Sequence, residues 1–419
     1  MQSTDVQARP RLPEGGGAAQ FHDPLCQWII AQGLAGATVA ELMQGFCDRA
    51  AGAGLPLLRC FIGVNTLNPL YRGYSLIWRR AGSGLSEESF LRREGDRAEF
   101  LRSPFHYMSE NGLTYLRQRL NEPAEHDFQI YDDFRAEGAT DYVVNVIAFA
   151  MDGVESSESG MLFSATTDRP GGFSTGQIEL LREQLQILGL AVRAAATHKT
   201  ALDVLAAYLG KDAGHRVLHG DIDRGNLHSI RAVILFADLR GFTRMSESVD
   251  AGELGSLLDT YMEAMVKPVE IYGGEVLKFM GDGILAVFEI GADEAKDSCR
   301  SGTGAASEML AGITLLNKRR RESDLPTMDL DIAVHLGDVL YGNVGAPGRL
   351  DFTVIGPAVN EASRIELKCR DLDVNVLFSD DFYNSATYCR PALRTLGRHQ
   401  LRDLDGPREL FTLTPDMLA

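Results

Sequence analysis

Two aspartates beside apolar, strand-like runs are the residues of this sequence best suited to chemistry. Asp238 closes the run AVILFAD, and Asp282 lies within GGEVLKFMGDGILAVF. Carboxylates in such positions can hold divalent cations and present them to a phosphorylated substrate. Each also has a structural interpretation, because an Asp after a strand often caps a helix and Asp-Gly is a common hairpin turn. Other segments must therefore decide between a metal site and two unrelated turns.

The segment RLDFTVIGPAVNEASRIE favours the functional interpretation. Pro357 suits the first turn of a helix, on which Asn360 and Arg364 are four residues apart and share one face. An amide and a guanidinium aimed at the same point suit a sugar oxygen and a phosphate that gathers charge. A solvated helix face would instead show charged pairs, so we expect Asn360 and Arg364 to be functional.

Two shorter signals lie near the aspartates. Gly241, Phe242 and Thr243 follow Asp238, and the backbone N–H groups of such a turn could cradle a triphosphate. Lys278 precedes Asp282 by four residues, so the two would share one face of a regular strand. Lys278 could equally be a solvated hairpin lysine.

Together, FADLRGFT, EVLKFMGDGILAVF and YGNVGAPGRLDFTVIGPAVNEASRIE resemble the catalytic domain of class III nucleotidyl cyclases. The resemblance covers residues 231–413 and implies an α/β domain with a ferredoxin-like βαββαβ core. It implies that Asp238 and Asp282, helped by the backbone of Leu239, bind two Mg²⁺ or Mn²⁺ ions in each active site.

The same resemblance implies the substrate contacts. Asn360 would orient the ribose, and Arg364 would stabilise the transition-state phosphate. Lys278 and Thr353 fall where the family reads the purine; lysine paired with Asp or Thr implies adenine, whereas Glu paired with Cys implies guanine. Thr353 is similar to the residue of a Thr-bearing bacterial subgroup. Arg402 falls where the family often has a lysine that touches the terminal phosphates.

The expected activity is that of an adenylate cyclase, a phosphorus–oxygen lyase that converts ATP to cyclic AMP and pyrophosphate. The family's sites form between two catalytic domains, and this chain holds one, so a homodimer is implied. A guanylate cyclase is the nearest alternative, disfavoured by Lys278. A nucleotide-binding regulatory module without turnover is another, disfavoured because no metal, ribose or phosphate residue is replaced. His335, in IAVHLGDVLYGNVG, matches no catalytic role, and we expect it to be structural.

The N-terminal half reads as a disordered lead-in over residues 1–20 and an α+β domain over 21–175. We expect a helix from about Pro24 to Ala53, strands in LLRCFIGVNTL, LYRGYSLIWRR, DYVVNVIAFAM and GMLFSATT, and a short helix in GLTYLRQRL. Its end, GMLFSATTDRPGGFSTGQIELLREQL, resembles the final strand and helix of GAF-type sensor domains, which implies a possible small-molecule ligand. Three side chains of this half could be imagined as haem or chromophore contacts: Cys60, His106 and His126. We expect each of them to be an ordinary buried or surface residue instead.

Residues 176–230 are predicted to form a signalling helix and connector. The helix opens with a capping box, Ser174 with Gln177. Apolar residues then alternate in steps of three and four, and the register continues to Leu209. This is the a/d pattern of a two-helix coiled coil, which we favour over a helix that packs on its own domain. The first a/d residues are Ile178, Leu181, Leu185, Leu188 and Val192.

Composition limits the remaining classes of function. The chain has 419 residues, enough for two or three domains, and a formal net charge of −17, which argues against a nucleic-acid partner. Its six cysteines are scattered, as in a reduced compartment. No signal peptide or run of about 20 apolar residues is present. We therefore expect a cytoplasmic protein without a membrane span.

Overall fold

The computed structural model describes residues 23–414, apart from 67, 70, 83, 93–97, 125, 127, 150–159, 248 and 292–294. The chain divides into two compact units, Met1–Val204 and Leu205–Ala419. The predicted lead-in over residues 1–20 lies outside the described residues. No helix in the described part combines the length and apolarity needed to cross a membrane.

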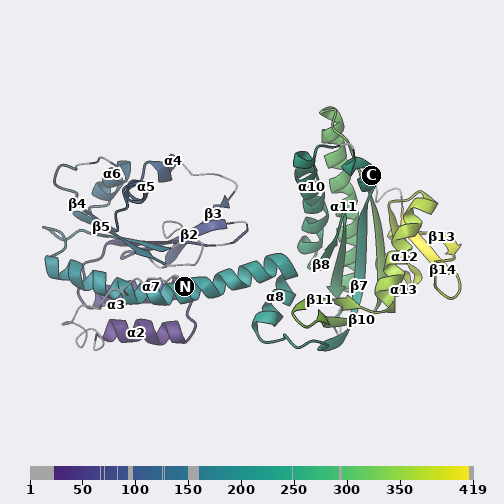
Figure 1. Cartoon of the computed structure of the whole chain (residues 1–419), viewed down its shortest axis with the longest axis horizontal. Coiled ribbons are helices and arrows are strands. Elements are labelled where there is room, and N and C mark those ends of the chain that lie inside the picture. The colour runs from purple at the N-terminus through teal and green to yellow at the C-terminus, as the bar shows by residue number, and fades with distance from the viewer. Residues whose placement is uncertain are drawn as a thin grey trace, which may run out of the picture. The chain divides into compact units, whose positions relative to one another are not determined.

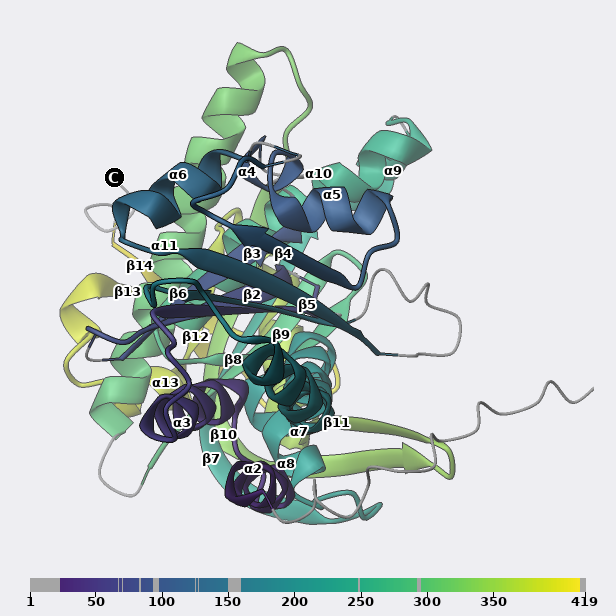
Figure 2. The ribbon, with the colours of Figure 1, turned by 90° about the vertical axis from the view of Figure 1, so that its left-hand side faces the viewer.

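An antiparallel sheet forms the centre of the N-terminal unit. Its elements are α2 Pro24–Leu34, α3 Val39–Gly52, β1 Arg59–Asn65, β2 Tyr71–Arg79, β3 Leu85–Leu91, α4 Ala98–Leu101, α5 Pro104–Glu110, β4 Tyr115–Arg119, α6 Gln129–Ala136, β5 Asp141–Ala148, β6 Gly160–Thr167 and α7 Thr175–Leu209. The six strands lie in the order β3-β2-β1-β6-β5-β4. Helices α5 and α6 cover one face, and α3 and α7 cover the other (Figure 2).

Two predictions for this unit are wrong, each for a local reason. The expected helix over residues 24–53 is two helices, because Gly36 adopts a left-handed φ of 79° and Thr38 then caps α3 in a capping box with Glu41. The segment GLTYLRQRL contains strand β4 rather than a helix, because pairing with β5 overrides its helical pattern. The four predicted strands correspond to β1, β2, β5 and β6.

Helix α7 begins at the predicted capping box, where Ser174 Oγ accepts from Gln177 N at 3.3 Å. The coiled-coil interpretation is wrong for its first half. The a/d residues from Ile178 to Val192 are buried in the core of their own unit, beside Phe46 and Phe163. Ala196 is the last buried residue of the helix, and the following turns are half-buried or exposed. The predicted a/d stripe is therefore unavailable to a partner helix from Ile178 to Val192.

The C-terminal unit has a mixed sheet with a ferredoxin-like centre. Its elements are α8 Lys211–Leu218, β7 Leu227–Arg240, α9 Phe242–Ser246, α10 Ala251–Ile271, β8 Glu275–Met280, β9 Gly283–Glu289, α11 Ala295–Glu322, β10 Asp329–Ala346, β11 Arg349–Ile355, α12 Pro357–Leu372, β12 Val376–Ser379, α13 Asp380–Ser385, β13 Leu393–His399 and β14 Arg408–Leu413. The strand order is β13-β14-β12-β10-β7-β9-β8, with β11 paired to β10. The order β10-β7-β9-β8, with the sequence βαββαβ, confirms the predicted core.

Alternation along the central strand divides the helices of this unit between two faces. Val233, Leu235 and Ala237 of β7 face α10 and α11, whereas Ala232 and Ile234 face α12. Figure 1 shows α10 and α11 together on their side of the sheet. Helix α8, absent from the sequence prediction, packs with the α12 face through Ala213.

Candidate functional site

The two aspartates meet at one end of the central strands. Asp238 lies in β7, opposite Gly283 of β9 on one side and Asp331 of β10 on the other. Asp282 occupies the turn between β8 and β9. Because β8 ends at Met280 and is irregular at Leu277, Lys278 and Asp282 do not share a regular strand face as predicted.

The turn that carries Asp282 depends on its glycines. Gly281 has a φ of 70°, a left-handed value that favours glycine. At Gly283, a Cβ atom would lie 2.7 Å from the carbonyl oxygen of Ala237 and 2.8 Å from Oδ1 of Asp238. Gly283 therefore lets the turn approach β7 closely and bring the two aspartates together.

Two arginines hold a third, fully buried carboxylate beside the pair. Asp331 has no exposed surface, and Arg240 Nε donates to its two oxygens at 3.1 and 3.2 Å. Arg370, from α12, donates through Nε to Asp331 at 3.1 Å and through its terminal nitrogen to Asp238 at 3.4 Å. Arg370 thus connects the buried anion to the partly exposed one.

The site carries excess negative charge. Burial and the nearby Asp282 raise the pKa of Asp238 to about 6, against the opposing effect of Arg370. Burial also raises the pKa of Asp282. Glu366 of α12 is only 3% exposed, its Oε1 has no hydrogen-bond partner among the described residues, and burial together with Asp238 raises its pKa to about 7.

These groups fit divalent cations. Asp238, Asp282, Asp331 and Glu366 share the two guanidinium groups of Arg240 and Arg370. Oxygen donors of this kind are the ligands that Mg²⁺ and Mn²⁺ prefer. A cation at the Asp238–Asp282 pair would offset the repulsion that the raised pKa values report.

The predicted purine-reading residues lie on neighbouring elements. Lys278 of β8 forms an ion pair with Asp351 of β11. Thr353 is two residues further along β11, so it lies on the same face of that strand as Asp351, and it is 7% exposed. The ammonium of Lys278 and the hydroxyl of Thr353 are therefore presented by adjoining strands.

The predicted phosphate and ribose residues lie along α12 and the loop before β14. Asn360 is exposed on the first turns of α12. Arg364 Nη2 lies 3.6 Å from a carboxylate oxygen of Asp403, and Arg402 Nε lies 3.4 Å from the same oxygen. The structure thus brings Arg364 and Arg402 together around one anion, and the arginine that α12 places at Asp238 is Arg370 rather than Arg364.

A short helix begins soon after Asp238. Leu239, the next residue of β7, is buried at 1% exposure with its side chain in the core, and it pairs with Leu330 of β10. Gly241 adopts a left-handed φ of 91° and starts α9, which has no side-chain cap. The N–H groups of Phe242 and Thr243, in the first turn, have no intrahelical acceptor.

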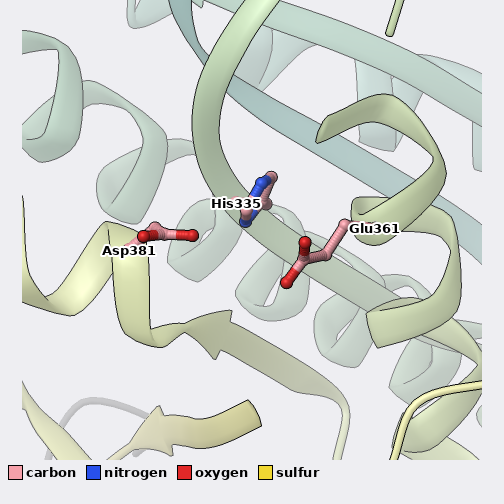
Figure 3. Close-up of side chains that lie close together, drawn as sticks. All are labelled: His335, Glu361 and Asp381. Carbon is pink, nitrogen blue, oxygen red and sulfur yellow. The ribbon is translucent and has the colours of Figure 1, made fainter. Parts of the chain in front are cut away.

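His335 belongs to a separate polar cluster (Figure 3). Its ring lies between Glu361 of α12 and Asp381 of α13, and the donor atoms of the three side chains lie within 4.8 Å of one another. Its Nδ1 is 2.9 Å from Ser379 Oγ, and burial lowers its pKa. Arg408 already supplies a cation to Glu361 at 2.9 Å. These contacts join β10, α12 and α13, in agreement with the predicted structural role.

The N-terminal haem or chromophore candidates are not gathered into one site. Cys60 is buried against the α3 and α7 side of the sheet, whereas His106 lies on α5, which covers the opposite face. His106 lies 3.5 Å from Glu110, and the ring of His126 packs on Tyr107.

Sequence reasoning missed the residues that support the aspartate pair: Arg240, Asp331, Glu366 and Arg370. The sequence did contain a signal for one of these residues, Asp331. It interrupts the apolar strand LDIAV, so its side chain must face a neighbouring element. Nothing in the sequence indicated that Arg370, rather than Arg364, reaches Asp238.

Comparison with known proteins identifies the family of this domain. Residues 228–409 match the family described as adenylate and guanylate cyclase catalytic domain. An adenylate cyclase of Anabaena cylindrica is 35% identical over 164 residues, which are 38% of this chain and 32% of that protein. Adenylate cyclase 1 of Rhizobium meliloti is 30% identical over 148 residues, which are 35% of this chain and 22% of that protein. The chain thus matches a third or less of each of these curated relatives.

Solved structures of the same kind are also similar. The adenylyl cyclase CyaB from P. aeruginosa is 26% identical with a TM-score of 0.41, over 45% of this chain and 96% of that one. The guanylyl cyclase Cya2 is 26% identical with a TM-score of 0.39, over 45% of this chain and 93% of that one. On the family match and the sequence relatives, the C-terminal part of this chain is a class III nucleotidyl cyclase catalytic domain.

The raised pKa of Asp238 gives a test of the metal site. A carboxyl whose pKa is higher in the folded state destabilises the fold once pH exceeds that pKa. In EDTA, Asp238→Asn should therefore unfold at a higher temperature than wild type at pH 8, and the difference should shrink as pH falls through about 6. Circular dichroism measures both midpoints.

Added Mn²⁺ should reverse the order, since it stabilises wild type and not the variant. The exposed Asp338→Asn is the matched control and should follow wild type throughout. A lower midpoint for Asp238→Asn in EDTA at pH 8 would contradict the assignment.

Proposed function

We propose that this chain is an adenylate cyclase that converts ATP to 3′,5′-cyclic AMP and pyrophosphate at the interface of a homodimer. The observation that carries the choice of ATP is the pairing of Lys278 with the β11 strand that bears Thr353. A lysine donor and a threonine hydroxyl suit the N1 acceptor and the 6-amino donor of adenine. Guanine presents the opposite pattern and would be better served by a carboxylate.

Asp238 and Asp282 would hold two Mg²⁺ or Mn²⁺ ions, with the backbone of Leu239 as a further ligand. When bound, such ions lower the pKa of the ribose 3′-hydroxyl and neutralise charge on the phosphates. The chain's own contribution before binding is to hold the carboxylates close together, with Arg370 at 3.4 Å from Asp238 offsetting part of their repulsion. Glu366, 3% exposed and with its pKa raised to about 7, is a further carboxyl close to them.

The remaining residues position the nucleotide. Asn360 would hydrogen-bond the ribose, and Arg364 would stabilise charge that develops on the α-phosphate. Arg402, which meets Arg364 at Asp403, would contact the terminal phosphates. The first amides of α9, at Phe242 and Thr243 after Gly241, would receive phosphate oxygens. No side chain needs to act as a nucleophile, since the ribose oxygen attacks directly.

The placement of α12 supports a homodimer. Arg364 and Arg370 are six residues apart, which is about 9 Å along a helix. Within one chain Arg370 contacts Asp238, and Arg364 pairs with Asp403 instead. We infer that Arg364 serves the aspartates of a second copy, so that two equivalent sites form between two chains.

The N-terminal unit would act as a GAF-like regulatory domain. Helix α7 leaves its core at Ala196 and continues to Leu209 as the route to the catalytic domain. A shift in such a helix can change an interface site, because catalysis is sensitive to displacements of about 1 Å.

The central experiment offers the purified full chain ATP and GTP together with Mn²⁺ and measures cyclic products and pyrophosphate. We expect cyclic AMP in excess, and a loss of at least about 100-fold for Asp282→Ala, because several kcal/mol of transition-state stabilisation depend on the metals. Cyclic GMP as the main product would establish the guanylate cyclase alternative. No product, with nucleotide still bound, would establish a binding module.

The shared site predicts complementation between inactive variants. Asp282→Ala and Arg364→Ala should each be inactive alone, whereas their mixture should regain about a quarter of wild-type activity, since half of the chains form mixed dimers with one intact site. Mixing Asp282→Ala with Asp238→Ala is the control and should restore nothing, because both variants lack metal ligands. Mixed dimers of the first pair without activity would show that the site lies within one chain.

Regulation through α7 predicts a dependence on helical phase. The insertion belongs after Ala201, just beyond the 3.0 Å hydrogen bond that joins Thr200 of α7 to Thr66. One or two inserted alanines rotate the downstream helix by about 100° or 200° and should change turnover sharply. Seven inserted alanines restore the helical phase to within about 20° and should change turnover little. Equal turnover for all three insertions, at equal dimer concentration, would make α7 a passive linker.

A further inference from the structure

We propose that the N-terminal unit contains a binding site for a small oxyanion, a carboxylate or a phosphate, between its sheet and α6. The site consists of Arg59 of β1, Thr166 of β6 and Tyr142 of β5. These residues form a single cross-strand row, because Arg59 pairs with Thr166 and Thr166 pairs with Tyr142. This inference is independent of the nucleotide that the catalytic domain uses.

Arg59 is a buried cation without a counter-ion. Its exposure is 8%, and it makes no hydrogen bond or ion pair with any described residue. Its guanidinium lies over the ring of Phe134 of α6, 5.2 Å from the centroid. Buried arginines are normally paired, because an isolated charge loses its hydration. Burial and the nearby Arg79 lower the pKa of Arg59, as expected for a buried guanidinium beside a second cation.

The carboxylate within electrostatic range is engaged elsewhere. Glu137, just past the end of α6, acts to raise the pKa of Arg59, so it lies close enough to interact. Its carboxylate pairs with Arg79 at 3.4 Å, and both of those side chains are more than one-third exposed. Of the two arginines, the more buried one, Arg59, is therefore left without an acidic partner among the described residues.

Two hydroxyls in the same row also lack partners. Thr166 Oγ1 and the Tyr142 hydroxyl are buried and form no hydrogen bond with any described group. Ser164 lies beside the Tyr142 hydroxyl, but outside ordinary hydrogen-bond geometry. Buried polar atoms without partners cost free energy and normally have a ligand or water. Here two such atoms accompany an unpaired cation.

The chemistry of the row selects an oxyanion. A guanidinium presents parallel N–H donors that match two oxygens of a carboxylate or phosphate. The two hydroxyls can donate to the same oxygens. A neutral ligand would leave the charge of Arg59 unpaired, and a cation would be repelled. The rings of Phe134 and Tyr131, which both contact the ring of Tyr142, would exclude water and strengthen the pairing.

The two tryptophans of the chain report on this unit alone. Both Trp28 and Trp78 lie in Met1–Val204, so tryptophan fluorescence of the full chain follows unfolding of the N-terminal unit. The experiment measures the midpoint of thermal unfolding by tryptophan fluorescence in sodium chloride, sodium acetate and sodium phosphate at equal ionic strength and pH. Acetate is the probe for a carboxylate ligand, and phosphate is the probe for a tetrahedral anion.

In wild type, acetate or phosphate should raise the midpoint by about 3 °C or more at ten times its dissociation constant. Arg59→Met should lose this response, and in chloride it should unfold at a higher temperature than wild type, because an uncompensated buried charge is removed. Arg79→Met removes a neighbouring exposed arginine and should keep the response.

Thr166→Val and Tyr142→Phe delete one hydroxyl each at nearly constant shape, so they test the site even where Arg59→Met folds poorly. Each should weaken the response to the anion while leaving the midpoint in chloride equal or higher. A wild-type midpoint that acetate and phosphate leave unchanged, or that shifts equally in Arg59→Met or in both hydroxyl variants, would overturn the proposal.

Discussion

The catalytic domain depends on one buried carboxylate. Asp331 has no exposed surface, and Arg240 and Arg370 supply the charge that makes its burial possible. Its place opposite Asp238 in the sheet brings a third carboxylate to the strand ends. The two arginines come from β7 and α12, so one anion fixes the strand and the helix on which the site is built.

Both units store charge that their own residues do not neutralise. At the end of β7 the excess is negative and partly accessible, as metal ions require. In the N-terminal sheet the excess charge is positive and lies on Arg59, which is only 8% exposed. In each case the fold gives up stability that an incoming ion of opposite sign can restore, which links binding to local order.

The sequence predicted the parts of the structure in which local pattern and tertiary context agree. The βαββαβ order was implied by the family resemblance, and α12 after Pro357 and the Asp-Gly hairpin turn at Asp282 follow from local turn chemistry. The errors lie where context decides. The segment with a helical pattern forms strand β4 because it pairs with β5. The apolar stripe of α7 that resembles a coiled coil is buried in the core of its own N-terminal unit. At the site, Asp282 was predictable because its Asp-Gly turn is local, whereas the contact of Arg370 with Asp238 joins residues 132 apart.

Helix α12 has a consequence for cooperativity. In the proposed dimer its N-terminal turns present Asn360 and Arg364 to one active site, while its last turns hold Arg370 against Asp238 of the other. Arg370 would share the charge of Asp238 with a bound metal ion, which would alter the contact that anchors the end of the helix. A rigid helix transmits such a change along its length, so occupancy of one site would be felt at the second. The two sites of such an enzyme would then show a Hill coefficient for metal different from one.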